Sequence, residues 1–199
     1  MGPTLITGPT AEPVTIQEAK DHCRVEVDTD NAWLMRAVRR AREQVEKDTR
    51  RQIMSATYDL ILDKFPSNSY RNEFCHGNRI WLPFPPLQSV TSITYTNEAG
   101  TPGQVLAASN YKVDLTSLPG QIALAFNATW PSAYAEPNVI AVRFVCGYSV
   151  VPESLNGAIL MLVAHWYENR AATEVGIRIA PIPLGYSEQI GDFVYREAA

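Results

Sequence analysis

The chain has 199 residues and a mass of 22.1 kDa, which fits one domain or one domain that carries an insertion. It is 46% hydrophobic, which supplies enough apolar surface for a real core, whereas only 19% of its residues are charged and its formal net charge is -4. Proteins that bind DNA by neutralising phosphates usually carry a basic excess, so the composition argues against that class.

Neither the cysteines nor the apolar segments indicate an exported or membrane-bound protein. The three cysteines have no paired spacing, which favours reduced thiols in a cytoplasmic fold over a disulfide framework. The N-terminus lacks the charged start and apolar run of a secretion signal. The longest strongly apolar segment, residues 158–164, is far shorter than the roughly 20 residues that cross a bilayer, so we expect no membrane partner.

Two helices are predicted in the first 50 residues. Thr15 lies three residues before Glu18, the spacing of a capping box, which predicts a helix over about 16–24. The polar run 28–31 caps a second helix, over about 30–50. One narrow face of this helix carries Leu34, Val38, Ala41 and Val45, and the opposite face carries Arg36, Arg39, Arg40, Glu43, Lys47 and Arg50. Such a charged face is more often solvated than bound to a partner, and both alternatives stay open.

From residue 52 the periodicity changes from that of a helix to that of a strand. Residues 54–62 alternate between apolar and polar side chains, which predicts a half-buried strand. Further strands are predicted at 79–82, 89–96, 111–115, 121–125 and 138–146, separated by turn-rich stretches. The short spacing indicates an antiparallel, β-rich insertion over about 52–147.

A third helix is predicted over about 152–170, where Pro152 is tolerated because the first turn of a helix leaves its amide positions unpaired. Its main apolar face is formed by Leu155, Ile159, Leu162, Val163 and Trp166. Apolar surface continues round the other side, on Leu160, Met161, Ala164 and Tyr167. A helix that is apolar on two sides needs two packing partners.

The last 29 residues, 171–199, have the pattern of an extended C-terminal arm. Residues 175–179 alternate like a strand, Pro181 and Pro183 exclude a central strand, and one or two helical turns are predicted near 186–193. An unpaired alternating segment can add to the edge of a partner's sheet. The alternative, an arm folded on its own subunit, has equal weight.

No set of residues in the sequence supports catalysis or a cofactor. The pairs His22-Cys23 and Cys75-His76 lack the zinc spacing, because adjacent ligands point apart on a helix or strand. Ser149 follows a single glycine and lacks the second glycine of a nucleophile elbow. Residues 100–103 lack the lysine and helix start of a phosphate loop. We therefore predict no catalytic, cofactor-binding or metal-binding residues.

Three segments in chain order carry a family pattern: Leu5–Pro9 with Glu12–Lys20, Trp81–Val90, and Val163–Arg170. The order of helices and sheet between them is preserved, so the likeness covers nearly the whole chain. In these segments the chain resembles the head-tail connector (adaptor) proteins of long-tailed phages, prophages and gene transfer agents.

The resemblance implies an α+β fold with a helical core of three main helices, an antiparallel β insertion and a C-terminal arm. Residues 1–170 would form a single connector domain and residues 171–199 the arm. The chain would pair with itself in a ring, expected to be twelve-fold, between the portal protein of a DNA-filled head and a tail-side connector or stopper protein. DNA would pass only as cargo. The expected location is the head-tail junction of a virion, after synthesis in the cytoplasm of a bacterial host.

Candidate contact residues follow from the charged helix face, the two-sided helix and the arm. The expected subunit interface comprises Arg36, Arg39, Arg40, Glu43, Lys47, Leu160, Met161 and Tyr167. The expected portal or tail docking residues are Val175, Ile177, Ile179, Ile182, Leu184, Phe193 and Tyr195. A neighbouring subunit and the β insertion are equally good partners for the second face of the 152–170 helix.

Two other functional classes compete with a structural ring. One is a small non-catalytic binding module whose β insertion holds a ligand, and the other is a hydrolase that uses Ser149 or His165. The mass of the protein in solution separates a ring from a binding module, whereas a hydrolase requires a turnover that these residues give no reason to expect.

Overall fold

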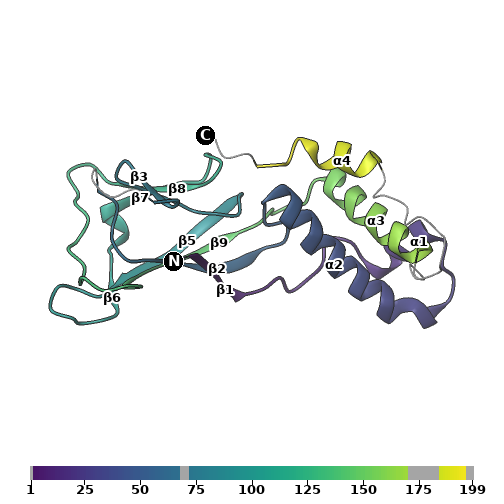
Figure 1. Cartoon of the computed structure of the whole chain (residues 1–199), viewed down its shortest axis with the longest axis horizontal. Coiled ribbons are helices and arrows are strands. Elements are labelled where there is room, and N and C mark those ends of the chain that lie inside the picture. The colour runs from purple at the N-terminus through teal and green to yellow at the C-terminus, as the bar shows by residue number, and fades with distance from the viewer. Residues whose placement is uncertain (1, 68–71, 170–183, 196–199) are drawn as a thin grey trace, which may run out of the picture. The chain divides into compact units, whose positions relative to one another are not determined.

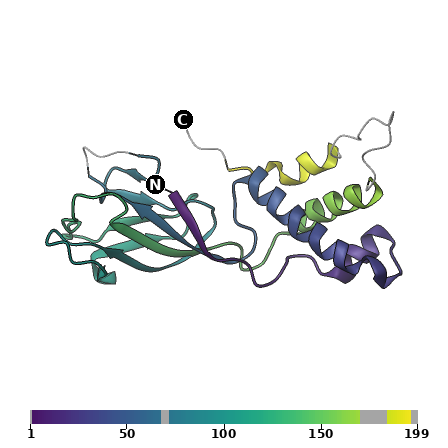
Figure 2. The same cartoon turned by 60° about the horizontal axis from the view of Figure 1, so that its bottom comes forward.

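The computed structural model describes residues 2–67, 72–169 and 184–195. The chain divides into two compact units, one formed by Met1–Pro9 and Ser55–Ser149 and the other by Thr10–Met54 and Val150–Ala199. Figure 1 and Figure 2 show that the first unit consists of strands and the second of helices. The combination of helices with antiparallel sheets confirms the predicted α+β class.

The β unit contains two antiparallel sheets. The five-stranded sheet has the order β1 (Gly2–Thr7), β2 (Ala56–Leu62), β9 (Ile140–Cys146), β5 (Leu87–Tyr95) and β6 (Gln104–Val105). The four-stranded sheet has the order β3 (Cys75–His76), β4 (Arg79–Trp81), β8 (Gln121–Leu124) and β7 (Tyr111–Asp114), and a short 3-10 helix, η2 (Ala108–Asn110), precedes β7. Six of these strands lie where strands were predicted, at β2, β4, β5, β7, β8 and β9.

Side chains from both sheets form one buried cluster. Leu60 of β2, Ile93 of β5 and Phe144 of β9 meet Ile80 of β4 and Ile122 of β8, and all five are fully buried. In β2 and β9 the buried residues stand at every second position, and the side chains that alternate with them are more exposed. The β unit therefore has a hydrophobic core of its own.

An ion pair joins two neighbouring strands of the larger sheet. Asp59 of β2 lies opposite Arg143 of β9, and the Arg143 guanidinium donates to both carboxylate oxygens at 2.8 Å. This hydrogen-bonded pair raises the pKa of Arg143. A shift of one residue in this pairing would separate the two groups and turn the buried faces outward.

The helical unit comprises α1 (Ile16–Cys23), η1 (Asp28–Asp30), α2 (Asn31–Thr49), α3 (Glu153–Glu168) and α4 (Leu184–Gly191). The predicted capping box is present, because the Glu18 amide donates to the Thr15 hydroxyl and the Thr15 amide donates to the Glu18 carboxylate. Helices α1 and α2 both end at an arginine in the left-handed region, Arg24 and Arg50.

Helix α3 lies at the centre of this unit and packs against α1, α2 and α4 (Figure 1). Its buried side chains are Leu155, Ala158, Ile159, Leu162 and Val163. Helix α4 approaches it closely at two glycines. A Cβ atom on Gly157 would lie 2.8 Å from the side chain of Gln189, and one on Gly185 would lie 3.1 Å from the Met161 methyl group. Glycine at these positions admits α4 to the surface of α3.

Candidate assembly surface

One exposed face of α2 carries most of the charge that the sequence analysis assigned to an interface. Arg36, Arg39, Arg40, Glu43 and Lys47 are all exposed, whereas the apolar residues of α2 are buried. The helix is therefore amphipathic as predicted. Its charged face belongs to the surface of the helical unit.

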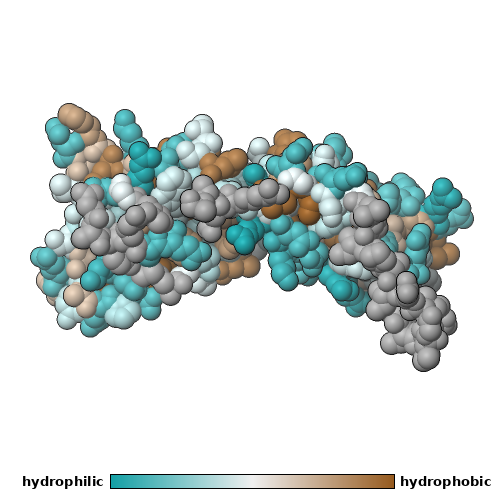
Figure 3. Space-filling model, turned by 45° about the horizontal axis from the view of Figure 1, so that its top comes forward, coloured by the Kyte–Doolittle hydropathy of each residue, from teal (hydrophilic) through white to brown (hydrophobic). Residues whose placement is uncertain are grey.

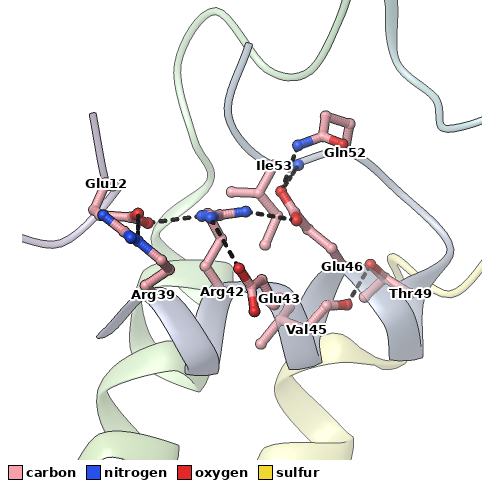
Figure 4. Close-up of polar contacts among 9 residues, drawn as sticks. All are labelled: Glu12, Arg39, Arg42, Glu43, Val45, Glu46, Thr49, Gln52 and Ile53. Atoms are coloured by element: carbon pink, nitrogen blue, oxygen red, sulfur yellow. Dashed lines mark hydrogen bonds and ion pairs between the residues drawn. The ribbon is translucent and has the colours of Figure 1, made fainter. Parts of the chain in front are cut away.

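A sixth charged residue of α2, Arg42, is buried and organises an ion-pair network that Figure 4 shows in close-up. Its side chain is only 7% exposed, and its guanidinium donates to Glu12 at 2.7 Å and to Glu46 at 2.7 Å. Glu43 lies 3.8 Å away on the same helix. The burial of Arg42 was not predicted, because the helical pattern places it beside the apolar face and its partner Glu12 is 30 residues away.

Glu46 extends this network to the segment that follows α2. Its second carboxylate oxygen accepts hydrogen bonds from the Gln52 side chain at 2.7 Å and from the Ile53 amide at 3.0 Å (Figure 4). Glu12, from the segment before α1, is joined to the same helix through Arg42. The network thus connects α2 to two segments outside the helices. One contains Glu12 and precedes α1, and the other contains Gln52 and Ile53 and follows α2.

Burial and charge oppose each other in this network. Burial raises the pKa of Glu46, and the attraction of Arg42 and the amides of Ile53 and Met54 only partly offset the increase. Burial also disfavours the charge of Arg42, but its hydrogen bond to Glu12 and the attraction of Glu46, Glu12 and Glu43 outweigh that effect, so its pKa is raised. Arg42 therefore keeps its positive charge near neutral pH.

Two of the predicted interface arginines are held in place by contacts within the chain. Arg39 lies 3.4 Å from Glu12 and keeps 67% of its side chain exposed, whereas the Arg40 guanidinium lies 4.2 Å from the centre of the Trp166 ring, a cation-π geometry. Arg36 and Lys47 have no acidic side chain within ion-pair distance among residues 2–67, 72–169 and 184–195.

The second side of α3 makes contacts within its own unit. The Tyr167 hydroxyl donates to Asp30 at 2.7 Å, and the Tyr167 ring meets Trp33 edge-on with centroids 5.5 Å apart. Met161 faces Gly185 of α4. Leu160 is partly buried. Two of the three α3 residues expected at a subunit interface therefore already contact other helices of the same chain.

The predicted docking residues fall partly outside the described structure. Val175, Ile177, Ile179 and Ile182 lie outside the described residues, and Leu184 is described only as the first residue of α4. Phe193 and Tyr195 are partly buried. The Phe193 carbonyl accepts a hydrogen bond from the Arg51 guanidinium, and the Tyr195 amide donates to the Thr49 carbonyl at 2.9 Å. In the described part, residues 184–195, the C-terminal segment thus packs on its own helical unit.

Helix α4 is joined to α2 by a partly buried hydrogen bond. Tyr186 and Ile190 are 3% and 6% exposed, and the Tyr186 hydroxyl donates to Asp48 at 2.6 Å. Burial and the neighbouring Asp48 carboxylate raise the pKa of Tyr186, so the phenol stays protonated and serves as a donor. These contacts make α4 part of the helical core.

The described residues contain no cluster suited to metal binding. No three His, Cys, Asp or Glu side chains in this part of the chain are arranged to hold an ion. Cys75 is fully buried, and burial raises its pKa to about 12. Ser149 is exposed, whereas His165 is partly buried and near the end of α3. Across the described ranges, no helix is both long and apolar enough to cross a bilayer.

On the face of the molecule drawn in Figure 3, hydrophobic residues form small, separate areas within a mostly hydrophilic surface. Large apolar patches usually mark obligate interfaces. Small ones surrounded by charge are typical of subunits that fold separately before they associate.

The fold, two antiparallel sheets with a helical unit built around α3, is similar to that of chains in solved particle structures. No protein-family model and no curated protein matches the sequence. A chain from the neck of an empty gene transfer agent (GTA) particle computed with C6 symmetry superposes with a TM-score of 0.78 at 21% identity. Chains from the virion of a native GTA particle and from its neck computed with C12 symmetry give TM-scores of 0.77 and 0.75 at 20% and 21% identity. Each alignment covers 100% of this chain and 98% of the other chain. The protein thus shares its whole fold with chains of GTA particles.

Proposed function

We propose that this protein is a structural adaptor of a virion neck, a ring that joins the DNA-filled head of a tailed phage or gene transfer agent to its tail. The observation that carries this proposal is the agreement of fold over the full length of the chain with chains of GTA necks. Both units of the protein take part in that agreement. A binding module that shared only the helices or only the sheets with the GTA chains would not match them over its whole length.

The ring is proposed to contain twelve copies and to lie between a portal protein and a tail-side connector or stopper. The C6 and C12 symmetries of the matched necks support repeated copies around an axis. The role is structural, and DNA passes through the ring as cargo. An acidic chain suits such a passage, because a net charge of -4 disfavours tight binding to the DNA backbone.

The contacts that close the ring are proposed to include the charged face of α2, with Leu160, Met161 and Tyr167 of α3 at its margin. Docking to the portal or tail protein is proposed for the C-terminal segment that contains Val175, Ile177, Ile179, Ile182, Leu184, Phe193 and Tyr195. The exposed positions of the α2 residues support the first assignment.

The test uses the purified full-length protein and the portal protein encoded in the same genome. Native mass spectrometry and negative-stain electron microscopy should detect a ring with the mass of twelve 22.1-kDa copies seated on the portal. The portal alone and the adaptor alone are the controls. If the folded protein neither binds the portal nor forms rings at high concentration, the proposed function is wrong.

A further inference from the structure

The exposed charges of the helical unit are distributed unevenly. Helix α2 carries five basic and three acidic residues, and buried Arg42 is neutralised by Glu46 and Glu12. What α2 presents to solvent is therefore mainly basic. We define the basic face of α2 as Arg36, Arg39, Arg40 and Lys47, all exposed, with Glu43 as its exposed acidic residue.

A second exposed surface of the same unit has the opposite sign. We define the acidic segment as Glu18 and Asp21 of α1, Glu26, and Asp28 of η1, all of which are exposed. Lys20 within this segment is buried, and its charge is already paired with Asp28 at 2.7 Å. Arg24 is its exposed cation. The segment therefore presents a net negative charge.

Some of these carboxylates also have local roles. Glu18 completes the α1 capping box, and its hydrogen bonds with Thr15 lower its pKa. Hydrogen bonds from Lys20 and Asn31 lower the pKa of Asp28. Neither role removes the charge from the surface, since the Asp28 side chain is 85% exposed. Asp21 and Glu26 form no ion pair with another described residue.

Each of the two surfaces also exposes one large apolar side chain. Met35 is 51% exposed beside Arg36 and Arg39 on α2, and Val27 is 57% exposed between Glu26 and Asp28. An apolar centre within a charged rim is the usual construction of a protein–protein contact. The two rims have opposite charge, so the surfaces are complementary to each other and each repels a second copy of itself.

We infer that the acidic segment of one subunit binds the basic face of α2 in a second copy of this chain. The inference rests on the proposed ring and assigns the contact that closes it. Because two different surfaces meet, the contact is heterologous and repeats from subunit to subunit until a ring closes. Exposed ion pairs are individually weak, so the charges select and orient the neighbour, and assembly weakens as salt is raised.

Charge reversal separates this contact from a general effect of charge. The first variant, Arg36→Glu with Lys47→Glu, makes the α2 face acidic. The second, Asp21→Lys with Glu26→Lys, makes the acidic segment basic. These four residues are chosen because none takes part in the Arg42 network, the capping box or the Lys20–Asp28 pair. Matched controls in the β unit are Lys64→Glu with Lys112→Glu and Glu98→Lys with Glu136→Lys, all at exposed positions.

Ring formation on the portal is measured by native mass spectrometry, with circular dichroism to show that each variant is folded. Each reversed protein alone is expected to need at least about tenfold more protein for half-maximal ring formation, since like charges then face each other. The controls should match the wild type. An equimolar mixture of the two reversed proteins should form rings in which they alternate, because every contact in the mixture again joins opposite charges.

The outcomes distinguish this inference from the proposed function. If wild-type rings form and both reversed proteins assemble equally well, the contact assigned here is wrong and the ring function stands. The same holds if wild-type rings form but the folded reversed proteins fail to assemble when mixed. If the wild type forms no ring under any condition, the proposed function fails, and the inference fails with it.

Discussion

Replacing Arg42 by methionine tests whether the ion-pair network holds the helical unit together. Methionine keeps an unbranched apolar side chain of similar length but leaves Glu46 and Glu12, which are 15% and 24% exposed, without their cation. Removing one partner of a buried ion pair costs about 3–5 kcal/mol. Both carboxylates keep some contact with water, so we expect Arg42→Met to lower the free energy of unfolding by about 3 kcal/mol.

The assay is urea unfolding followed by far-ultraviolet circular dichroism, since the network lies in the helical unit. Arg36→Met is the matched control on the same helix, and its exposed position predicts a change within about 0.5 kcal/mol. A second variant, Arg42→Met with Glu46→Gln, removes the charge left without a partner and should recover part of the loss.

The loss should also depend on pH, and its direction follows from Glu46. Burial raises the pKa of Glu46, and without Arg42 nothing of opposite charge offsets that effect. A carboxyl group whose folded pKa is raised stabilises the fold below its unfolded pKa and loses that contribution as the pH rises through the folded value. Arg42→Met should therefore be closer to the wild type near about pH 4 than near about pH 8. A loss below about 1 kcal/mol at neutral pH would refute this account of the network.

Three further predictions concern the β unit and the thiols. Near neutral pH a thiol reagent should modify Cys23 but not Cys75 or Cys146 in the folded protein. Cys75 and Cys146 are buried, and burial raises the pKa of Cys75 to about 12. Rapid labelling of all three cysteines, measured by mass spectrometry, would contradict this prediction. Hydrogen bonds from Ser117, Thr116 and Gln121 lower the pKa of Asp114, so its contribution to stability is present above the unfolded pKa and lost as the pH falls through the folded value. The urea midpoint should accordingly fall more steeply with acid in the wild type than in Asp114→Asn, and parallel curves would exclude this role. Gly120→Ala should destabilise the β unit by about 1–3 kcal/mol, because the added Cβ atom would lie 2.5 Å from the Cβ atom of Leu87. Gly8→Ala is the control and should be neutral in the same unfolding assay, since its added Cβ atom would lie 3.8 Å from the nearest side-chain atom, on Leu5.

Local patterns made much of the fold predictable. The steps of four, three and four between Leu34, Val38, Ala41 and Val45 require only that one helix face be buried. Thr15 and Glu18 fix a helix start by contacts within four residues. Strand β1 was not predicted, because it depends on pairing with β2, whose residues follow 50 or more positions later, and most of its side chains are exposed. Such pairing leaves little periodicity in a short edge strand.

The polar network was not predictable for a similar reason. Arg42 is one of several arginines on α2, and nothing in its neighbours indicates that it alone is buried. Its burial depends on Glu12 and on the segment of Gln52 and Ile53, which fold back on α2 from both directions along the chain. Sequence spacing records contacts within a helix but not these returns.

The packing of α3 changes which surfaces remain for a neighbouring subunit. The sequence showed a helix that is apolar on two sides, and the structure gives it α1, α2 and α4 as partners within one chain, with Gly157 and Gly185 admitting α4. A subunit whose central helix is already covered can fold alone, so the proposed ring does not need a neighbour to complete its core. The basic face of α2 and the acidic segment remain exposed, and contacts of this kind form between folded subunits and respond to salt. Such an interface would let the protein be made as a monomer and close into a ring only where a portal gathers the copies.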